Sequence, residues 1–224
     1  MHKVGIISDT HGLLRPEILE NLKECDAILH AGDVNKPGIL DELSRISSIY
    51  AVRGNNDKEW ASHLREVLCF ELYGIKFLMV HNKKMVPPAK MREADIIIYG
   101  HSHKFEMKYV GEQLWLNPGS CGPRRFVQPV TMVVLEIEDD GRYRVVKIEI
   151  NDGAVEHEVL KRNDLTGNIR QIISQVMADV EKGKSVAEIS KKYKISEELA
   201  EQICRLYVTH PGVDEDGIMT KMGL

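Results

Sequence analysis

The sequence has 224 residues, which is enough for one sizeable α/β domain with room for a small second domain. The formal net charge of -4 argues against a general nucleic-acid-binding protein, because such proteins present a basic face. Its four cysteines are scattered without a CxxC pair, which argues against a zinc finger or a disulfide framework and fits a reducing compartment. We find no signal peptide and no apolar run long enough to span a membrane, so we expect a cytoplasmic protein.

The first 60 residues alternate between buried strands and helices. Apolar runs predict strands at 3–7, 26–29 and 48–52, and helices that begin near Pro16 and Pro37 lie between them. This order implies parallel strands with right-handed crossovers. The pattern then changes to strand pairs and one further apolar strand, at 69–72, 76–80, 95–99, 105–110, 113–116, 130–137 and 143–150. We therefore predict a parallel core extended by antiparallel strands, arranged as two packed sheets with helices outside.

The last quarter of the chain is predicted to be helical. Apolar residues recur at helical spacing from Asn168, and Gly183 ends this first helix. A short helix at 186–193 follows, Ser196 caps a third helix, and Pro211 stops it. This order looks like a helix-turn-helix. We predict a first, α/β domain at 1–160, a linker at 161–167 and a helical domain at 168–224.

Five predicted strands end in loops that carry side chains of the kinds that bind metals. Because they all follow strands, we expect these side chains to gather on one edge of the sheet. The set contains carboxylates, imidazoles and one amide but no thiolate, which suits Mn, Fe, Ni or Zn better than copper or calcium. Seven ligands are too many for one tetrahedral ion and fit two ions that share a carboxylate. These seven residues are Asp9, His11, Asp33, Asn55, His81, His101 and His103.

The ordered set resembles the calcineurin-like metallophosphoesterase superfamily, and most closely its small bacterial and archaeal phosphodiesterase branch. The motifs that carry the resemblance are Asp9-x-His11, Gly32-Asp33, Gly54-Asn55-x-Asp57, His81, Gly100-His101-x-His103, Asn117-Pro118-Gly119-Ser120 and Pro123-Arg124. They span roughly residues 1 to 155. The resemblance implies an α/β fold: a four-layer αββα sandwich of two mixed sheets flanked by helices, to which this chain adds a small all-α C-terminal domain.

The resemblance also implies a site for two divalent ions, with manganese first and iron, nickel or zinc as alternatives. Asp9, His11, Asp33 and His103 would hold the first ion. Asp33 would bridge to the second ion, which Asn55, His81 and His101 would complete. The implied reaction is hydrolysis of a phosphodiester, either a small molecule or a nucleotide, by in-line attack of a hydroxide bridging the two ions. Four of these ligands are expected to be catalytic residues: His11, Asp33, Asn55 and His101.

Two positions depart from the family pattern. Asn56 stands where many family members have a histidine that protonates the leaving oxygen, and an amide cannot transfer a proton at useful pH. This departure favours diesters with stabilised leaving groups over a general monoesterase. Lys83 follows His81-Asn82, where relatives often have a second histidine. We expect the substrate to be bound by Asn56, Lys83, Asn117 and Arg124.

Two other functions compete with hydrolysis. One is a binding scaffold without turnover, although such a scaffold has no need of all seven ligands. The other is a DNA-associated nuclease or regulator that uses the helical tail. Three glutamates at 197, 198 and 201 would repel phosphates from the presumed recognition helix. We therefore expect the tail to bind a protein partner, to form a homo-oligomer or to pack, rather than to bind specific DNA.

Overall fold

The computed structural model describes residues 1–124, 128–151, 154–160, 162–193 and 195–222. The chain divides into two compact units, Met1–Leu160 and Lys161–Leu224, which we call the N-terminal and C-terminal units. Among the described residues, no helix combines the length and the apolar character that a membrane span requires.

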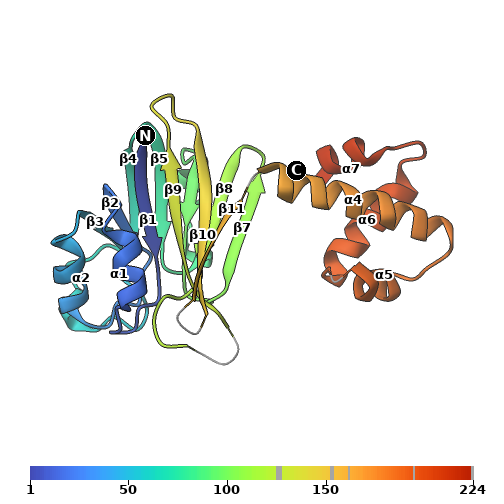
Figure 1. Ribbon diagram of the computed structural model, residues 1–224. Coiled ribbons are helices and arrows are strands. Elements are labelled where there is room, and N and C mark those ends of the chain that lie inside the picture. The colour runs from blue at the N-terminus through green and yellow to red at the C-terminus, as the bar shows by residue number, and fades with distance from the viewer. Residues whose placement is uncertain (125–127, 152–153, 161, 194, 223–224) are drawn as a thin grey trace. The chain divides into compact units, whose positions relative to one another are not determined.

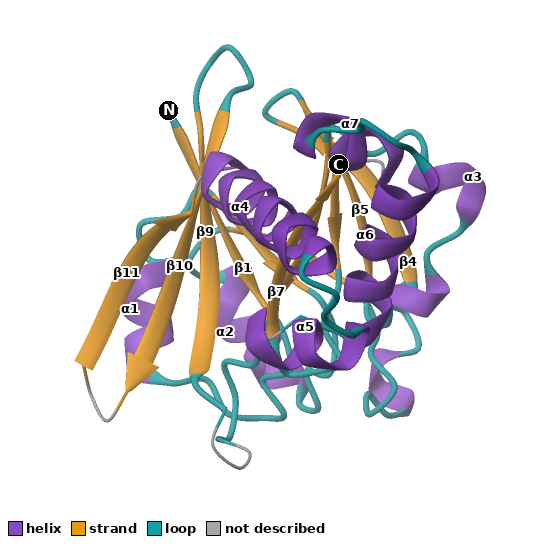
Figure 2. Cartoon of the chain, turned by 90° about the vertical axis from the view of Figure 1, so that its right-hand side faces the viewer, coloured by secondary structure: helices purple, strands orange, loops and turns teal. Residues whose placement is uncertain are grey.

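The N-terminal unit contains a six-stranded sheet with the order β11-β10-β9-β1-β2-β3 (Figure 1). Three neighbouring strands run parallel: β1 (His2–Ile7), β2 (Ala27–His30) and β3 (Ser48–Ala51). The other three are joined by antiparallel pairing: β9 (Val130–Ile137), β10 (Tyr143–Asn151) and β11 (Ala154–Leu160). Figure 2 shows these three side by side at one edge of the sheet.

A second, five-stranded sheet has the order β4-β5-β6-β8-β7. Its strands are β4 (Val67–Leu72), β5 (Ile75–Val80), β6 (Ile96–Ile98), β7 (Phe105–Val110) and β8 (Gln113–Pro118). The central strands β5, β6 and β8 are parallel, and an antiparallel partner closes each edge. Both sheets are therefore mixed, as predicted.

The layers follow from where the apolar residues lie. The two sheets enclose one buried core between them, to which Ile6, Phe77 and Val133 belong. A second core lies between the first sheet and the helices α1 (Pro16–Leu22) and α2 (Pro37–Ser44). On the outer face of the second sheet, Met91 of the short helix α3 (Pro88–Met91) packs against a smaller cluster. The unit is thus a four-layer αββα sandwich, with a thin outer layer on the second sheet.

Strand register brings the predicted loops together. Ile7 at the end of β1 pairs with His30 at the end of β2, and His30 pairs with Ala51 at the end of β3. The parallel strands β5 and β6 likewise end side by side. The segments that follow are the strand-end loops, at 8–15, 31–36, 52–58, 81–82 and 99–104. Two of these loops lead directly into short 3-10 helices, η1 (Glu59–Ala61) and η2 (Lys83–Met85).

The C-terminal unit is a separate helical cluster. It consists of α4 (Arg162–Glu181), α5 (Val186–Tyr193), α6 (Glu197–Thr209) and α7 (Glu215–Met222). These helices share their own core, whose centre includes Ile173, Ile189 and Ile203. Ser196 caps α6 as predicted, because its side chain accepts a hydrogen bond of 3.1 Å from the Leu199 amide.

Three elements differ from the sequence-based prediction. Helix α4 begins at Arg162, so residues 162–167 of the predicted linker are helical. Strand β11 and helix α7 were not predicted. Residue 161 of the predicted linker lies outside the described part of the chain.

Candidate metal centre

The strand-end loops hold an unusual backbone conformation. Six non-glycine residues in them have positive φ, between 46° and 70°: Asp9, His11, Asp33, Asn35, His101 and His103. Residues other than glycine rarely adopt positive φ, because this backbone conformation is strained for them. The strain persists only where the surrounding structure enforces it. Backbone hydrogen bonds between the loops do so here, because Asp9 N–H donates to the Gly32 carbonyl and His11 N–H to the Asp33 carbonyl, each at 3.0 Å.

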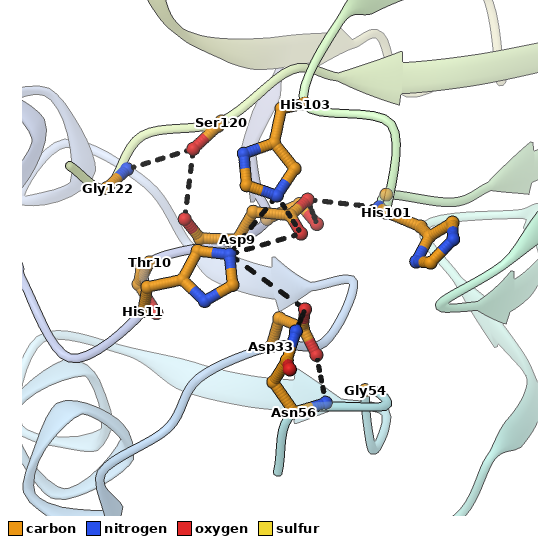
Figure 3. Close-up of polar contacts among 12 residues, drawn as sticks. Asp9, Thr10, His11, Asp33, Gly54, Asn56, His101, His103, Ser120 and Gly122 are labelled. Carbon is orange, nitrogen blue, oxygen red and sulfur yellow. Dashed lines mark hydrogen bonds and ion pairs between the residues drawn. The ribbon is translucent and has the colours of Figure 1, made fainter. Parts of the chain in front are cut away.

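Asp9 lies at the centre of the site and is completely buried (Figure 3). Its Oδ2 accepts hydrogen bonds from the Ser8 hydroxyl at 2.6 Å and from the His101 amide at 3.1 Å. Its Oδ1 has no hydrogen-bond partner and lies 3.3 Å from Nε2 of His103 and 3.8 Å from Nε2 of His11. Burial raises the pKa of this carboxyl to about 6. Oδ1 of Asp9 is therefore a buried oxygen with no hydrogen bond to satisfy it, and together with the two nearby imidazole nitrogens it could bind a metal cation.

Asp33 presents a second carboxylate to the same space. Its Oδ1 accepts a hydrogen bond of 2.8 Å from the Asn56 backbone, and its Oδ2 accepts one of 2.6 Å from the Asn56 side chain. The same Oδ2 lies 3.4 Å from Nε2 of His81 and 3.9 Å from Nε2 of His11. Burial raises the pKa of Asp33, but the His81 imidazole and the Asn56 donors outweigh it and hold that pKa well below its usual range.

His81 has an orientation that exposes a lone pair to the site. Its Nδ1 lies 2.8 Å from the Ala31 carbonyl, which can only accept, so Nδ1 carries the proton. The buried Nε2 points at Asp33 and has no hydrogen-bond partner, so the neutral form of the ring would present a lone pair there. Burial lowers the pKa of His81, but contact with the Asp33 carboxylate outweighs burial and raises that pKa. A ligand histidine that donates its other N–H to a carbonyl is a common arrangement at metal sites.

Five predicted ligands therefore come together in two groups, each with donor atoms within 4.8 Å of one another. Asp9, His11 and His103 form one group, and Asp9, Asp33 and His81 form the other. Asp9 is the residue common to both, whereas the resemblance gave the bridging role to Asp33. The nitrogen and oxygen donors, with the unpartnered buried atoms of Asp9 and His81, fit divalent metal ions.

The remaining two predicted ligands lie beside these groups. Asn55 and His101 are exposed, and Oδ1 of Asn55 is 2.9 Å from Nδ1 of His101. The rings of His81 and His101 meet edge to face, with centroids 5.2 Å apart. Figure 3 shows the His101 imidazole directed away from Asp9 and His103.

The residues predicted to bind substrate have different surroundings. The Asn56 side chain contacts Asp33, as described above. Lys83 is half exposed and forms an ion pair of 3.0 Å with Glu106. Asn117 is buried and shapes its loop, because its side chain donates to the Gly100 carbonyl at 2.8 Å and accepts from the Gly119 amide at 2.9 Å. Arg124 lines a small cavity beside His103.

Sequence reasoning quoted Asp57 as part of a motif but gave it no role. The structure buries this carboxylate, which accepts hydrogen bonds from the backbone N–H groups of Asp33 at 3.1 Å, Asn35 at 2.7 Å and Gly54 at 2.8 Å. Gly54 is required at this crossing, because a Cβ there would overlap the Asp33 backbone nitrogen. Asp57 therefore joins the loop after β2 to the loop after β3.

Known proteins share both the sequence pattern and the fold. Residues 2–140 match the model of the calcineurin-like phosphoesterase superfamily domain. A probable metallophosphoesterase of Methanothermobacter thermautotrophicus is 30% identical over 145 residues, which cover 58% of this chain and 84% of that protein. A phosphodiesterase of Methanocaldococcus jannaschii is 31% identical over 140 residues, which cover 53% and 84%.

Among solved structures, Vps29 of Entamoeba histolytica in complex with Zn²⁺ is 26% identical with a TM-score of 0.60, covering 70% of this chain and 98% of its own. A Streptococcus pneumoniae protein described as a predicted phosphoesterase is also 26% identical, with a TM-score of 0.54 and coverage of 71% and 98%. Residues 2–140, which match the family model, contain the strand-end loops and both ligand groups. The chain therefore belongs to the calcineurin-like phosphoesterase superfamily.

Proposed function

We propose that the protein is a phosphodiesterase that uses two divalent metal ions, of which manganese is the first candidate and iron, nickel and zinc are alternatives. The observation that carries this proposal is the convergence of Asp9, Asp33 and His81 in a buried space where Asp9 Oδ1 and His81 Nε2 have no hydrogen-bond partner. The phosphodiesterase of M. jannaschii and the Zn²⁺ complex of the amoebal Vps29 support it.

Each ligand has a definite role in this proposal. Asp9, His11 and His103 would hold one ion, and Asp9, Asp33 and His81 would hold the other, completed by Asn55 and His101 at the exposed side. When bound, the two ions would supply the chemistry that activates water and neutralises phosphate charge. The protein's own contribution is to orient these donors: Ala31 fixes the His81 tautomer, and Ser8 fixes the Asp9 carboxylate.

The substrate class is a diester rather than a monoester. Asn56 offers no transferable proton beside the candidate ligands, so a leaving group that departs without protonation is favoured. We further propose that residues 1–160 carry the activity in the cytoplasm, where the four unpaired cysteines would be stable, and that the C-terminal unit serves protein association.

Hydrolysis of a chromogenic phosphodiester by metal-free protein with and without added Mn²⁺ tests the proposal. We expect Mn²⁺ to stimulate hydrolysis and the variants Asp9→Asn and His81→Ala to lose at least about 100-fold in kcat/KM, roughly 2.7 kcal/mol of transition-state stabilisation. His157→Ala is the matched control, because His157 lies exposed on β11, and it should retain full activity.

Two results would contradict the proposal. The first is the absence of hydrolysis with Mn²⁺, Fe²⁺, Ni²⁺ or Zn²⁺, which would favour a binding scaffold. The second is equal activity in the parent and the Asp9→Asn variant, because the only carboxylate common to both ligand groups would then be dispensable.

A further inference from the structure

Asn56 contacts both oxygens of one candidate ligand. Its backbone N–H donates to Oδ1 of Asp33 at 2.8 Å (Figure 3). Its side-chain amide donates to Oδ2 at 2.6 Å. Two donors from a single residue on the two oxygens of a carboxylate define the plane of that carboxylate. The side chain of Asp33 is buried, so this orientation is held inside the site.

The position of Asn56 is itself fixed by its neighbours. Asp57, the next residue, accepts hydrogen bonds from the N–H groups of Gly54 and Asp33. These bonds tie the loop that carries Asn56 to the loop that carries Asp33. The Asp57 N–H donates to the Gly54 carbonyl at 3.3 Å and closes the turn. The amide of Asn56 therefore meets Asp33 through a short, braced segment rather than through a free loop.

The oxygen that receives the side-chain amide is the one that faces the imidazoles. Oδ2 of Asp33 lies 3.4 Å from Nε2 of His81 and 3.9 Å from Nε2 of His11. Rotation of the carboxylate would move this oxygen away from both nitrogens. A neutral amide donor prevents that rotation without adding a charge or a titrating group, and it competes with no ligand because it has no lone pair on nitrogen to offer.

We propose that Asn56 is a positioning residue, whose side-chain amide holds Asp33 in the orientation that binds metal, rather than a group that binds substrate. This inference rests on the proposed function, since it concerns a ligand of the same site. It predicts that loss of the amide weakens metal binding before any substrate is present.

The test compares two substitutions at this position. Asn56→Leu keeps the bulk of the side chain without the donor, and Asn56→Ala removes both, while each retains the backbone N–H bond to Oδ1. Titration calorimetry of the metal-free full-length protein with Mn²⁺ should give an affinity about 10- to 100-fold weaker in both variants. Asn21→Ala is the matched control, because Asn21 loses a comparable amide bond, to the Glu17 carbonyl in α1, and should bind Mn²⁺ like the parent.

Spectroscopy and kinetics give independent readouts. The electron paramagnetic resonance signal of coupled Mn²⁺ pairs should diminish in both variants at a metal concentration that saturates the parent. With saturating Mn²⁺, kcat should recover in large part while KM stays within about twofold of the parent. Circular dichroism confirms that each variant is folded.

Unchanged Mn²⁺ affinity in both variants, with or without a raised KM, would overturn the positioning role while leaving the two-metal proposal intact. A parent protein that binds no divalent metal would overturn both. A larger loss in Asn56→Ala than in Asn56→Leu would also contradict the proposal, because bulk rather than the hydrogen bond would then be responsible.

Discussion

His30 is a fully buried histidine at the end of β2, between the loops that carry Asp9 and Asp33. Its Nδ1 accepts a hydrogen bond of 3.2 Å from the Gly32 N–H, and its Nε2 lies 3.0 Å from the Thr10 hydroxyl. Burial lowers its pKa to about 3, so the folded protein holds this ring neutral. The ring therefore braces two strand-end loops without contributing a charge.

This histidine should make stability depend on pH. Its pKa is about 3 when folded and 6.5 in the reference state, so its contribution is complete above pH 6.5 and is lost as pH falls toward 3, because the unfolded chain takes up the proton first. The expected slope is up to about 1.4 kcal/mol per pH unit. We would measure the free energy of unfolding in urea for the metal-free parent and the His30→Asn variant at pH 6.5 and pH 5. The difference between the two proteins should be smaller at pH 5 by about 2 kcal/mol. If the two free energies change with pH in parallel, the assignment is wrong.

The ligands could be predicted from the sequence, but the residues that orient them could not. Asp9 and Asp33 each follow a recognisable apolar strand, so their convergence is a consequence of strand order. The bond between Asn56 and Asp33 depends on how two loops cross, which is set by the close approach at Gly54 and by the three N–H groups on Asp57. Such contacts are tertiary, and no local pattern encodes them.

Among the helices and strands, those with a clear local pattern of apolar residues were predicted, and those without one were missed. The strand at 96–98 and the helix at 186–193 have clear apolar patterns and were found. Strand β11 was missed because it is an exposed edge strand with two glutamates and a histidine among its seven residues. The start of α4 was missed because residues 163–168 are rich in asparagine, aspartate, threonine and glycine, which favour loops and caps over helix interiors.

One ion cluster organises the helices of the C-terminal unit. Asp179 of α4 is buried, and its carboxylate contacts Lys184 Nζ at 2.8 Å, Lys192 Nζ at 2.6 Å and the Tyr193 hydroxyl at 2.7 Å. These partners lie on the turn after α4 and at the end of α5. Their hydrogen bonds hold the pKa of Asp179 well below its usual range. The cluster thus joins two helices through one side chain.

Removing this charge should loosen the C-terminal unit. We expect Asp179→Asn to lower its melting temperature by several degrees, because two lysines lose their common partner. The depressed pKa means that the stabilisation is present above the ordinary aspartate range and is lost as pH falls below it. Thermal melts followed by circular dichroism at 222 nm measure the effect. Asp216→Asn breaks an exposed pair with Arg170 and should change the melt by about one degree at most; equal shifts in the two variants would contradict the role of burial.

For the whole molecule, the proposed function places catalysis in the N-terminal unit and protein association in the C-terminal unit. The seven predicted ligands lie in the N-terminal unit, and the family match ends at residue 140. The C-terminal unit has its own core and four helices, of which α5 and α6 were predicted to form a helix-turn-helix. The helix-turn-helix motif stays a prediction. Whether it could bind DNA depends on the charge of the exposed residues at the start of α6. Glu197, Glu198 and Glu201 are exposed in the first turns of α6.

These three glutamates should prevent the C-terminal unit from binding DNA. A helix that enters a groove places its first turns near the phosphates, where carboxylates are repelled. In a gel shift at about 50 mM salt, we expect the full chain to leave duplex DNA unshifted at micromolar concentration. A variant with Glu197→Lys and Glu201→Lys reverses the charge of this surface and should gain weak binding that falls steeply with added salt. A sequence-selective shift by the parent, absent from a fragment of residues 1–160, would instead make the C-terminal unit a DNA-binding element and the protein a DNA-associated one.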